Sequence, residues 1–176
     1  WQHPEWPDFQ YSLAEVEELL YKFSQKTGRV SGLLEGLDEH TQTEAIISLM
    51  VFEAVKTSEI EGEYLSRQDV MSSIRNNLGL SQDKVQDQRA EGAAELMLDV
   101  RNSYADPLTE EKLFAWHRML MKGNTHVNAG RWRVHKEPMQ VVSGAMGKER
   151  VHFEAPPSSS VPAEMERFIR WFNQTE

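Results

Sequence analysis

The feature that most constrains this 176-residue chain is a long helix-forming run that ends in an acidic turn containing glycine. Residues 44–56 are almost continuously helix-forming, and the heptapeptide Thr57-Ser-Glu-Ile-Glu-Gly-Glu63 follows them. Glycine at position 62 suits the end of a helix because it adopts left-handed backbone conformations without a Cβ penalty. The carbonyl end of a helix disfavours carboxylates, and this turn carries three of them, at Glu59, Glu61 and Glu63. Such a local violation indicates a functional site rather than an ordinary turn.

The rest of the chain predicts a mainly α fold with one β-hairpin. Capping boxes predict helix starts at Ser12 and Thr41, and Ser66-Arg-Gln-Asp69 predicts the start of a third helix. The segment 45–55 is apolar nearly all round, which predicts a helix buried on several sides. Apolar side chains at helical spacing predict three further helices, over about 87–104, from Thr109 to near Gly123, and from Pro162 onward.

The predicted hairpin is the one part of the chain with strand-like composition. The pattern of residues 139–143 and 149–153 predicts two short strands around a glycine-containing turn. A lone hairpin is marginally stable in water, so we expect it to rest on helices or to receive a partner strand.

Composition excludes several classes of protein. The 39% hydrophobic residues suffice for a core, while the formal net charge of −9 argues against broad attraction to nucleic acid. No apolar run reaches the roughly 18–20 residues that span a bilayer. The absence of cysteine excludes disulfides and thiolate metal sites, and fits a reducing, cytoplasmic environment. The six histidines lack the spacing of a metal motif, so we predict no metal site in this chain.

Both ends of the chain suggest an excerpt. It begins with Trp1 rather than methionine and stops at Glu176, directly after an amphipathic helical pattern. We therefore expect this sequence to be part of a larger protein.

Several motifs together resemble the Fic-domain proteins. Thr57-x-x-x-Glu61-Gly62 is similar to the inhibitory motif S/T-x-x-x-E-G/N of the class whose autoinhibitory helix lies N-terminal to the Fic core. Its neighbours occur in the matching order, namely Trp1-Gln-His-Pro-Glu-Trp-Pro7, Ser72-Ser-Ile74 with Leu78-Gly-Leu80, and Ala129-Gly-Arg-Trp-Arg133 before the hairpin. The resemblance covers essentially the whole chain.

The resemblance implies a Fic-like helical bundle in two parts. Residues 1–80 would form an N-terminal helical region that carries the inhibitory motif. Residues 81–176 would form the first part of the Fic core, including a flap hairpin at about 138–154. In Fic proteins the flap receives a target segment by strand addition, and Val141, Val142 and Met146 are the positions expected to contact the target.

The activity that the resemblance implies is protein AMPylation. The intact protein would transfer AMP from ATP, with Mg²⁺, to a Ser, Thr or Tyr hydroxyl of a target protein. Glu61 would pair with an arginine of the catalytic loop and occupy the space that the ATP γ-phosphate needs, and in some relatives the same glutamate supports AMP removal instead. Thr57 and Gly62 would fix the helix rather than contact nucleotide. The oligomeric state stays open, and a homo-oligomer is compatible with this reading.

One departure from the family decides what this chain does alone. The catalytic signature H-P-F-x-x-G-N-G-R is absent from residues 1–176. We therefore assign no catalytic or metal-binding residue here, and expect the chain alone to be inactive and to bind no cofactor. The alternative is a non-catalytic helical interaction module, such as an inhibitor that supplies Glu61 in trans.

Each motif also has a structural interpretation. Glu61 could be a solvated carboxylate in a turn, with Thr57 bonded back to a helix carbonyl and Gly62 simply ending the helix. The hairpin could be an ordinary surface element, and Gly130-Arg-Trp-Arg133 is more readily a structural segment than a phosphate site. Trp1, Trp6 and Phe9 are expected to anchor the N-terminal arm to the helices.

Overall fold

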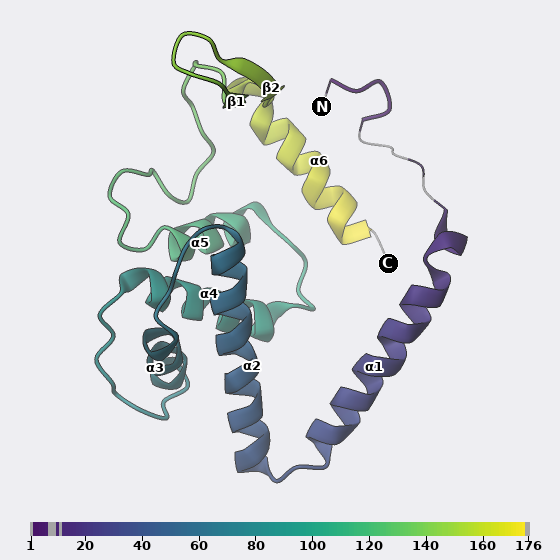
Figure 1. The fold of residues 1–176 in the computed structure, drawn as a ribbon, viewed down its shortest axis with the longest axis vertical. Helices are drawn as coiled ribbons and strands as arrows, with labels where there is room; N and C mark the ends of the chain where they lie inside the picture. The colour runs from purple at the N-terminus through teal and green to yellow at the C-terminus, as the bar shows by residue number, and fades with distance from the viewer. Residues whose placement is uncertain (1, 7–9, 11, 175–176) are drawn as a thin grey trace. The chain divides into compact units, whose positions relative to one another are not determined.

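The computed structural model describes residues 2–6, 10 and 12–174, and it is mainly helical with one two-stranded antiparallel sheet (Figure 1). This confirms the predicted fold class. The chain forms two compact units. The helical unit comprises Gln10–Ala105 and Arg118–Val127, and the hairpin unit comprises Trp1–Phe9, Asp106–His117 and Asn128–Glu176.

Four helices make up most of the helical unit: α1 (Glu17–Glu35), α2 (Glu39–Ile60), α3 (Arg67–Asn77) and α4 (Gln88–Ser103). Helices α2, α3 and α4 pack on one another (Figure 1). Their shared core is built from the buried side chains of Ile47, Val51, Ala54, Val70, Ile74, Ala90 and Ala94. The predicted boundary after residue 80 falls in the connection between α3 and α4, which share this core.

Helix α2 is buried along one side only, whereas its sequence predicted burial on several sides. Ile47, Val51 and Ala54 are spaced as one helical stripe and are at most 2% exposed. On the opposite side Leu49 and Phe52 are 53% and 54% exposed. The core of the unit lies on a single side of α2, and Leu49 and Phe52 lie on the side away from it.

Both predicted capping boxes are wrong. The carboxylate of Asp38 accepts a 3.0 Å hydrogen bond from the Thr41 amide, so α2 begins at Glu39, before the predicted Thr41 cap. Ser12 precedes a short 3₁₀ turn, Leu13–Glu15, and makes no side-chain cap bond. The prediction for α3 is confirmed, because the Ser66 hydroxyl accepts from the Asp69 amide at 3.2 Å.

Helix α1 continues past two glycines, although glycine in a helix interior is destabilising. It runs through Gly28 and Gly32 and ends before Gly36. None of its residues is buried, and Leu19, Leu20 and Phe23 are all more than half exposed. The apolar side chains of α1 are therefore not covered within the described part of the helical unit.

Helix α4 matches the predicted span closely. Its N-cap is Asp87 and its C-cap is Tyr104. Ala93 is buried and Met97 packs on the core, whereas Val100, on the same apolar pattern, is 38% exposed.

The hairpin unit holds β1 (Gln140–Ser143), β2 (Arg150–Glu154), a 3₁₀ turn at Ser158–Ser160 and α6 (Val161–Gln174), together with the first part of α5 (Glu110–Leu120). The Asn173 side chain connects α6 to the segment before α5, since it donates to the carbonyl of Leu108 at 2.9 Å and accepts from its amide at 2.8 Å. Trp6 is 44% exposed, and its predicted partners Trp1 and Phe9 lie outside the described residues.

Candidate functional site

The acidic turn at the end of α2 has a well-defined backbone. Gly62 has a φ of +82°, the left-handed conformation that glycine adopts most readily. Its amide bonds to the carbonyl of Glu59 at 3.0 Å, and the amide of Glu63 bonds to the carbonyl of Ser58 at 2.8 Å. These two bonds form a Schellman turn, so the predicted role of Gly62 in ending the helix is confirmed.

Two of the three carboxylates of this turn have a cationic partner among the described residues. Glu59 pairs with Lys56 at 2.5 Å, and Glu63 pairs with Arg89 at 2.8 Å. Glu61 is the C-cap residue and is exposed. In the part of the chain that the structure describes, its carboxylate makes no ion pair or hydrogen bond. The unfavourable position of a carboxylate at a helix carbonyl end is therefore offset for Glu59 and Glu63 and persists for Glu61.

Thr57 lies one turn before Glu61 and contacts the preceding turn. Its hydroxyl donates to the carboxylate of Glu53 at 3.1 Å, and its carbonyl accepts from the amide of Glu61 at 3.3 Å. The sequence predicted a bond from the Thr57 hydroxyl to a helix carbonyl, and the acceptor in the structure is a side chain instead.

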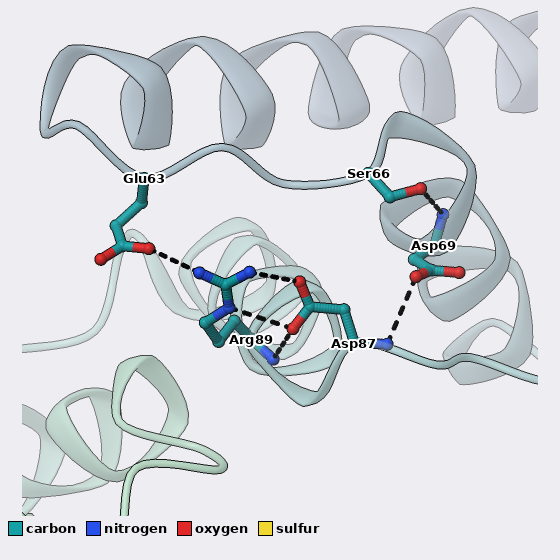
Figure 2. Close-up of polar contacts among 5 residues, drawn as sticks. All are labelled: Glu63, Ser66, Asp69, Asp87 and Arg89. Atoms are coloured by element: carbon teal, nitrogen blue, oxygen red, sulfur yellow. Dashed lines mark hydrogen bonds and ion pairs between the residues drawn. The ribbon is translucent and has the colours of Figure 1, made fainter.

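The pair between Glu63 and Arg89 belongs to a polar cluster that we call the polar clamp, comprising Glu63, Arg89, Asp87 and Asp69 (Figure 2). Arg89 donates through Nη1 to Glu63 at 2.8 Å, and through Nη2 and Nε to the two carboxylate oxygens of Asp87 at 2.9 and 3.2 Å. The amide of Asp87 donates to the carboxylate of Asp69 at 3.3 Å. These four residues thus connect three segments of the chain, which are the end of α2, the start of α3 and the start of α4.

Electrostatics within the polar clamp follow from these contacts. The side-chain hydrogen bond from Arg89 is the main cause that lowers the pKa of the Asp87 carboxyl below its ordinary value. The same bond is the main cause that raises the pKa of the Arg89 guanidinium. Asp87 is the N-cap of α4, and Asp69 lies in the first turn of α3. Negative charge is favourable at both positions because the N-terminal end of a helix carries partial positive charge.

No pattern in the sequence predicts the polar clamp. From the sequence, Glu63 stands out only as a carboxylate at the carbonyl end of a helix, and no motif includes Arg89. The available signal was Asp87, an aspartate directly before the apolar pattern of α4 and hence a candidate N-cap. The clamp borders an open pocket of about 760 Å³ that is also lined by residues 123–126.

The hairpin presents apolar side chains to solvent. Val141 pairs with Phe153 and Val142 with Val151, with an irregularity in the register between Val141 and Val142. All five residues of β2 and all four of β1 are exposed. Met146 in the turn is 97% exposed. The three predicted contact positions, Val141, Val142 and Met146, are therefore accessible in the hairpin unit.

The segment at Gly130–Arg133 is tied into the hairpin unit. Trp132 donates through Nε1 to Glu110 at 3.0 Å and packs edge-on against Phe114, with ring centroids 4.7 Å apart. The Arg133 guanidinium donates to the carbonyl of Pro156, and the Gly130 amide donates to His117 at 3.2 Å. These contacts support the structural interpretation of the segment.

The described residues contain neither a metal-binding cluster nor a membrane-spanning helix. No group of three or more His, Asp or Glu side chains among them is arranged to hold a metal ion. Likewise, none of the helices in residues 2–6, 10 and 12–174 combines the length and apolarity that crossing a membrane requires.

Comparison with known proteins identifies one region. Residues 1–80 match the model of a family described as "Domain of unknown function (DUF4172)". This range includes the whole of α2, α3 and the acidic turn. The description names no activity, and no curated protein matches the chain.

Proposed function

We propose that this chain is the regulatory and target-docking part of a Fic protein adenylyltransferase, with Glu61 as its intramolecular brake. The observation that carries the proposal is the contrast within the acidic turn. Glu59 and Glu63 are paired with cations, whereas the carboxylate of Glu61 is exposed at the hydrogen-bonded end of α2. A carboxylate presented in this way is available to a guanidinium supplied from outside the described residues.

The chemistry of the brake is competition between anions. A carboxylate and a phosphate both bind one guanidinium through two hydrogen bonds. An exposed pair contributes only about 0–1 kcal/mol, whereas removing one partner of a buried pair costs about 3–5 kcal/mol. A hundredfold switch corresponds to about 2.7 kcal/mol, which lies between these limits. Partial burial of Glu61 against a catalytic loop would supply that amount.

Nucleotide and Mg²⁺ would be held elsewhere than in residues 1–176, because these contain no Fic signature. When bound, MgATP supplies the AMP that is transferred. The contribution of this chain is the side chain of Glu61, which excludes the γ-phosphate, and the platform that holds it. That platform is α2, anchored by Ile47, Val51 and Ala54 in the core.

The hairpin supplies the docking half of the proposal. In a two-stranded sheet each strand has one edge without a partner strand, and such an edge pairs readily with an extended segment. The exposed side chains of Val141, Val142 and Met146 would contact the target segment while its backbone carries the hydroxyl residue into register.

Replacing Glu61 tests the brake in a protein that contains both this region and a Fic catalytic loop. We expect Glu61→Gly to raise auto-AMPylation with MgATP, measured as added AMP by intact mass. Glu59→Gly is the matched control because it removes a carboxylate from the same turn that is already paired with Lys56. Equal adduct formation in wild type and Glu61→Gly would contradict the proposal. AMP removal by the wild type but not by Glu61→Gly would assign Glu61 to the reverse reaction.

A second candidate function is a non-catalytic helical module that supplies Glu61 in trans. The observation that favours it is the uncovered apolar face of α1, on which Leu19 and Phe23 are 63% and 68% exposed. An uncovered face of this kind marks an interaction surface. Adding the purified 176-residue chain to a Fic catalytic domain without its own inhibitory glutamate separates the two. If the chain is such a module, we expect the wild-type chain to inhibit that domain and the Glu61→Gly chain not to inhibit it. Absence of inhibition by the wild-type chain would exclude this function.

A further inference from the structure

We infer that Arg89 is a positioning residue that sets the direction of the Glu61 turn by holding Glu63. The inference rests on the proposed function for its regulatory meaning, and on the geometry of the helical unit for its structural part. Figure 2 shows Glu63 reaching from the end of α2 toward Arg89, which lies at the start of α4.

Glu63 is well placed to control Glu61. It is the last residue of the Schellman turn, since its amide bonds to the carbonyl of Ser58. Glu61 precedes it by two residues in the same turn. Fixing the side chain of Glu63 therefore fixes the path along which the chain leaves α2, and with it the direction in which the Glu61 side chain points.

Arg89 is in turn held by the rest of the polar clamp. Two of its donors go to Asp87, the N-cap of α4, and the amide of Asp87 is bonded to Asp69 in the first turn of α3. A guanidinium bridges two carboxylates because its donors form a rigid planar fork, which the ammonium group of lysine lacks. These contacts connect the end of α2 to the starts of α3 and α4, the two helices that pack against it.

The charges of the polar clamp make Arg89 its necessary member. Two carboxylates, those of Glu63 and Asp87, contact the one guanidinium of Arg89 (Figure 2). Without Arg89 they repel one another, and the turn loses the contact that orients it. Glu63 and Arg89 are 60% and 52% exposed, so this contact is a weak one that can be released at small cost.

Amide hydrogen exchange on the 176-residue chain tests the positioning role. We expect Arg89→Ala and Glu63→Gln each to speed exchange of the Gly62 and Glu63 amides about two- to fivefold, the size that an exposed pair allows. The Gly79 and Leu80 amides, which close the equivalent turn of α3, are the internal reference and should not change. Arg101→Ala, at the other end of α4, is the matched control.

The double variant separates positioning from a general structural role. If Arg89 acts through Glu63, Arg89→Ala combined with Glu63→Gln exchanges no faster than either single variant. Arg89→Lys should restore part of the protection because it keeps the charge without the fork. Multiplying effects in the double variant, or unchanged exchange in the singles, would overturn the inference.

The AMPylation assay separates this inference from the proposed function. Glu63→Gln and Arg89→Ala should raise auto-AMPylation in the same direction as Glu61→Gly, but by less. A response to Glu61→Gly alone overturns the regulatory role of Arg89 and leaves the brake intact. Faster exchange with no response to Glu61→Gly retains Arg89 as the positioning residue of the turn and overturns the proposed function.

Discussion

The carboxylate of Glu63 accepts a 2.8 Å hydrogen bond from Arg89, which lies 26 positions later in the chain. This contact explains why one carboxylate of the acidic turn tolerates the negative end of helix α2. A similar compensation holds for Glu59 through Lys56. Glu61, which lies between them, is left as the unpaired carboxylate of the three in the described chain.

The packing of α2 gives the first prediction. Ile47 is 1% exposed in the core, so Ile47→Ala should lower the free energy of unfolding by about 2–5 kcal/mol. Leu49→Ala is the matched control on the same helix, since Leu49 is 53% exposed, and it should change stability by less than about 0.5 kcal/mol. Urea unfolding followed by circular dichroism measures both. Equal losses would mean that both sides of α2 are covered.

The close approach of α4 and the end of α5 gives the second prediction. A Cβ atom at Gly92 would collide with the carbonyl oxygen of Met119 and lie 3.0 Å from the Cβ of Lys122. Gly92→Ala should therefore destabilise the protein by about 1–3 kcal/mol. Gly28→Ala, where a Cβ meets nothing within 4 Å, should instead stabilise α1 by about 0.5–1 kcal/mol. Thermal unfolding distinguishes the two, and a neutral Gly92→Ala would contradict the packing.

A buried hydroxyl gives the third prediction. Ser73 is 1% exposed, and in the described part of the chain its Oγ has no hydrogen-bond partner. Removing an unsatisfied buried polar group recovers its desolvation penalty, so Ser73→Ala should raise the free energy of unfolding by about 1 kcal/mol. Ser72→Ala, next to it on α3, controls for the higher helix propensity of alanine. A loss of stability in Ser73→Ala alone would indicate a hidden partner.

Asp87 gives a prediction about pH. Its folded-state pKa is lowered, mainly by the hydrogen bond from Arg89. The stability that it contributes is therefore fully present above its unfolded-state pKa, near 3.8, and is lost as the pH falls through the lower folded-state value. We expect wild type to be more stable than Asp87→Asn at pH 5 and this difference to shrink below about pH 4. A difference that stays constant down to pH 3 would show that ionisation of Asp87 is not involved.

Local features were predicted well because their causes are local. The left-handed turn at Gly62, the Ser66 cap of α3 and the span of α4 follow from backbone preferences of a few adjacent residues. The Thr41 cap failed for an equally local reason, since Asp38 competes for the same amide and starts the helix earlier.

Contacts between distant residues could not be predicted in the same way. Nothing in the spacing of Glu63, Asp69, Asp87 and Arg89 indicates that they meet, because their distances depend on how α2, α3 and α4 pack. The burial of α2 was overstated for a related reason. Its composition is apolar on several sides, while the number of sides that are covered depends on its neighbours.

The sequence by itself determined the mainly helical class, the hairpin at about 138–154 and the position of an acidic turn at the end of α2. These depend on periodicity and on the conformational freedom of single residues, which the order of amino acids encodes directly. Only the tertiary structure decided which of the three carboxylates lacks a cationic partner among the described residues. Glu63 finds Arg89 because folding brings the end of α2 to the start of α4, and Glu61 meets no cation in the described chain.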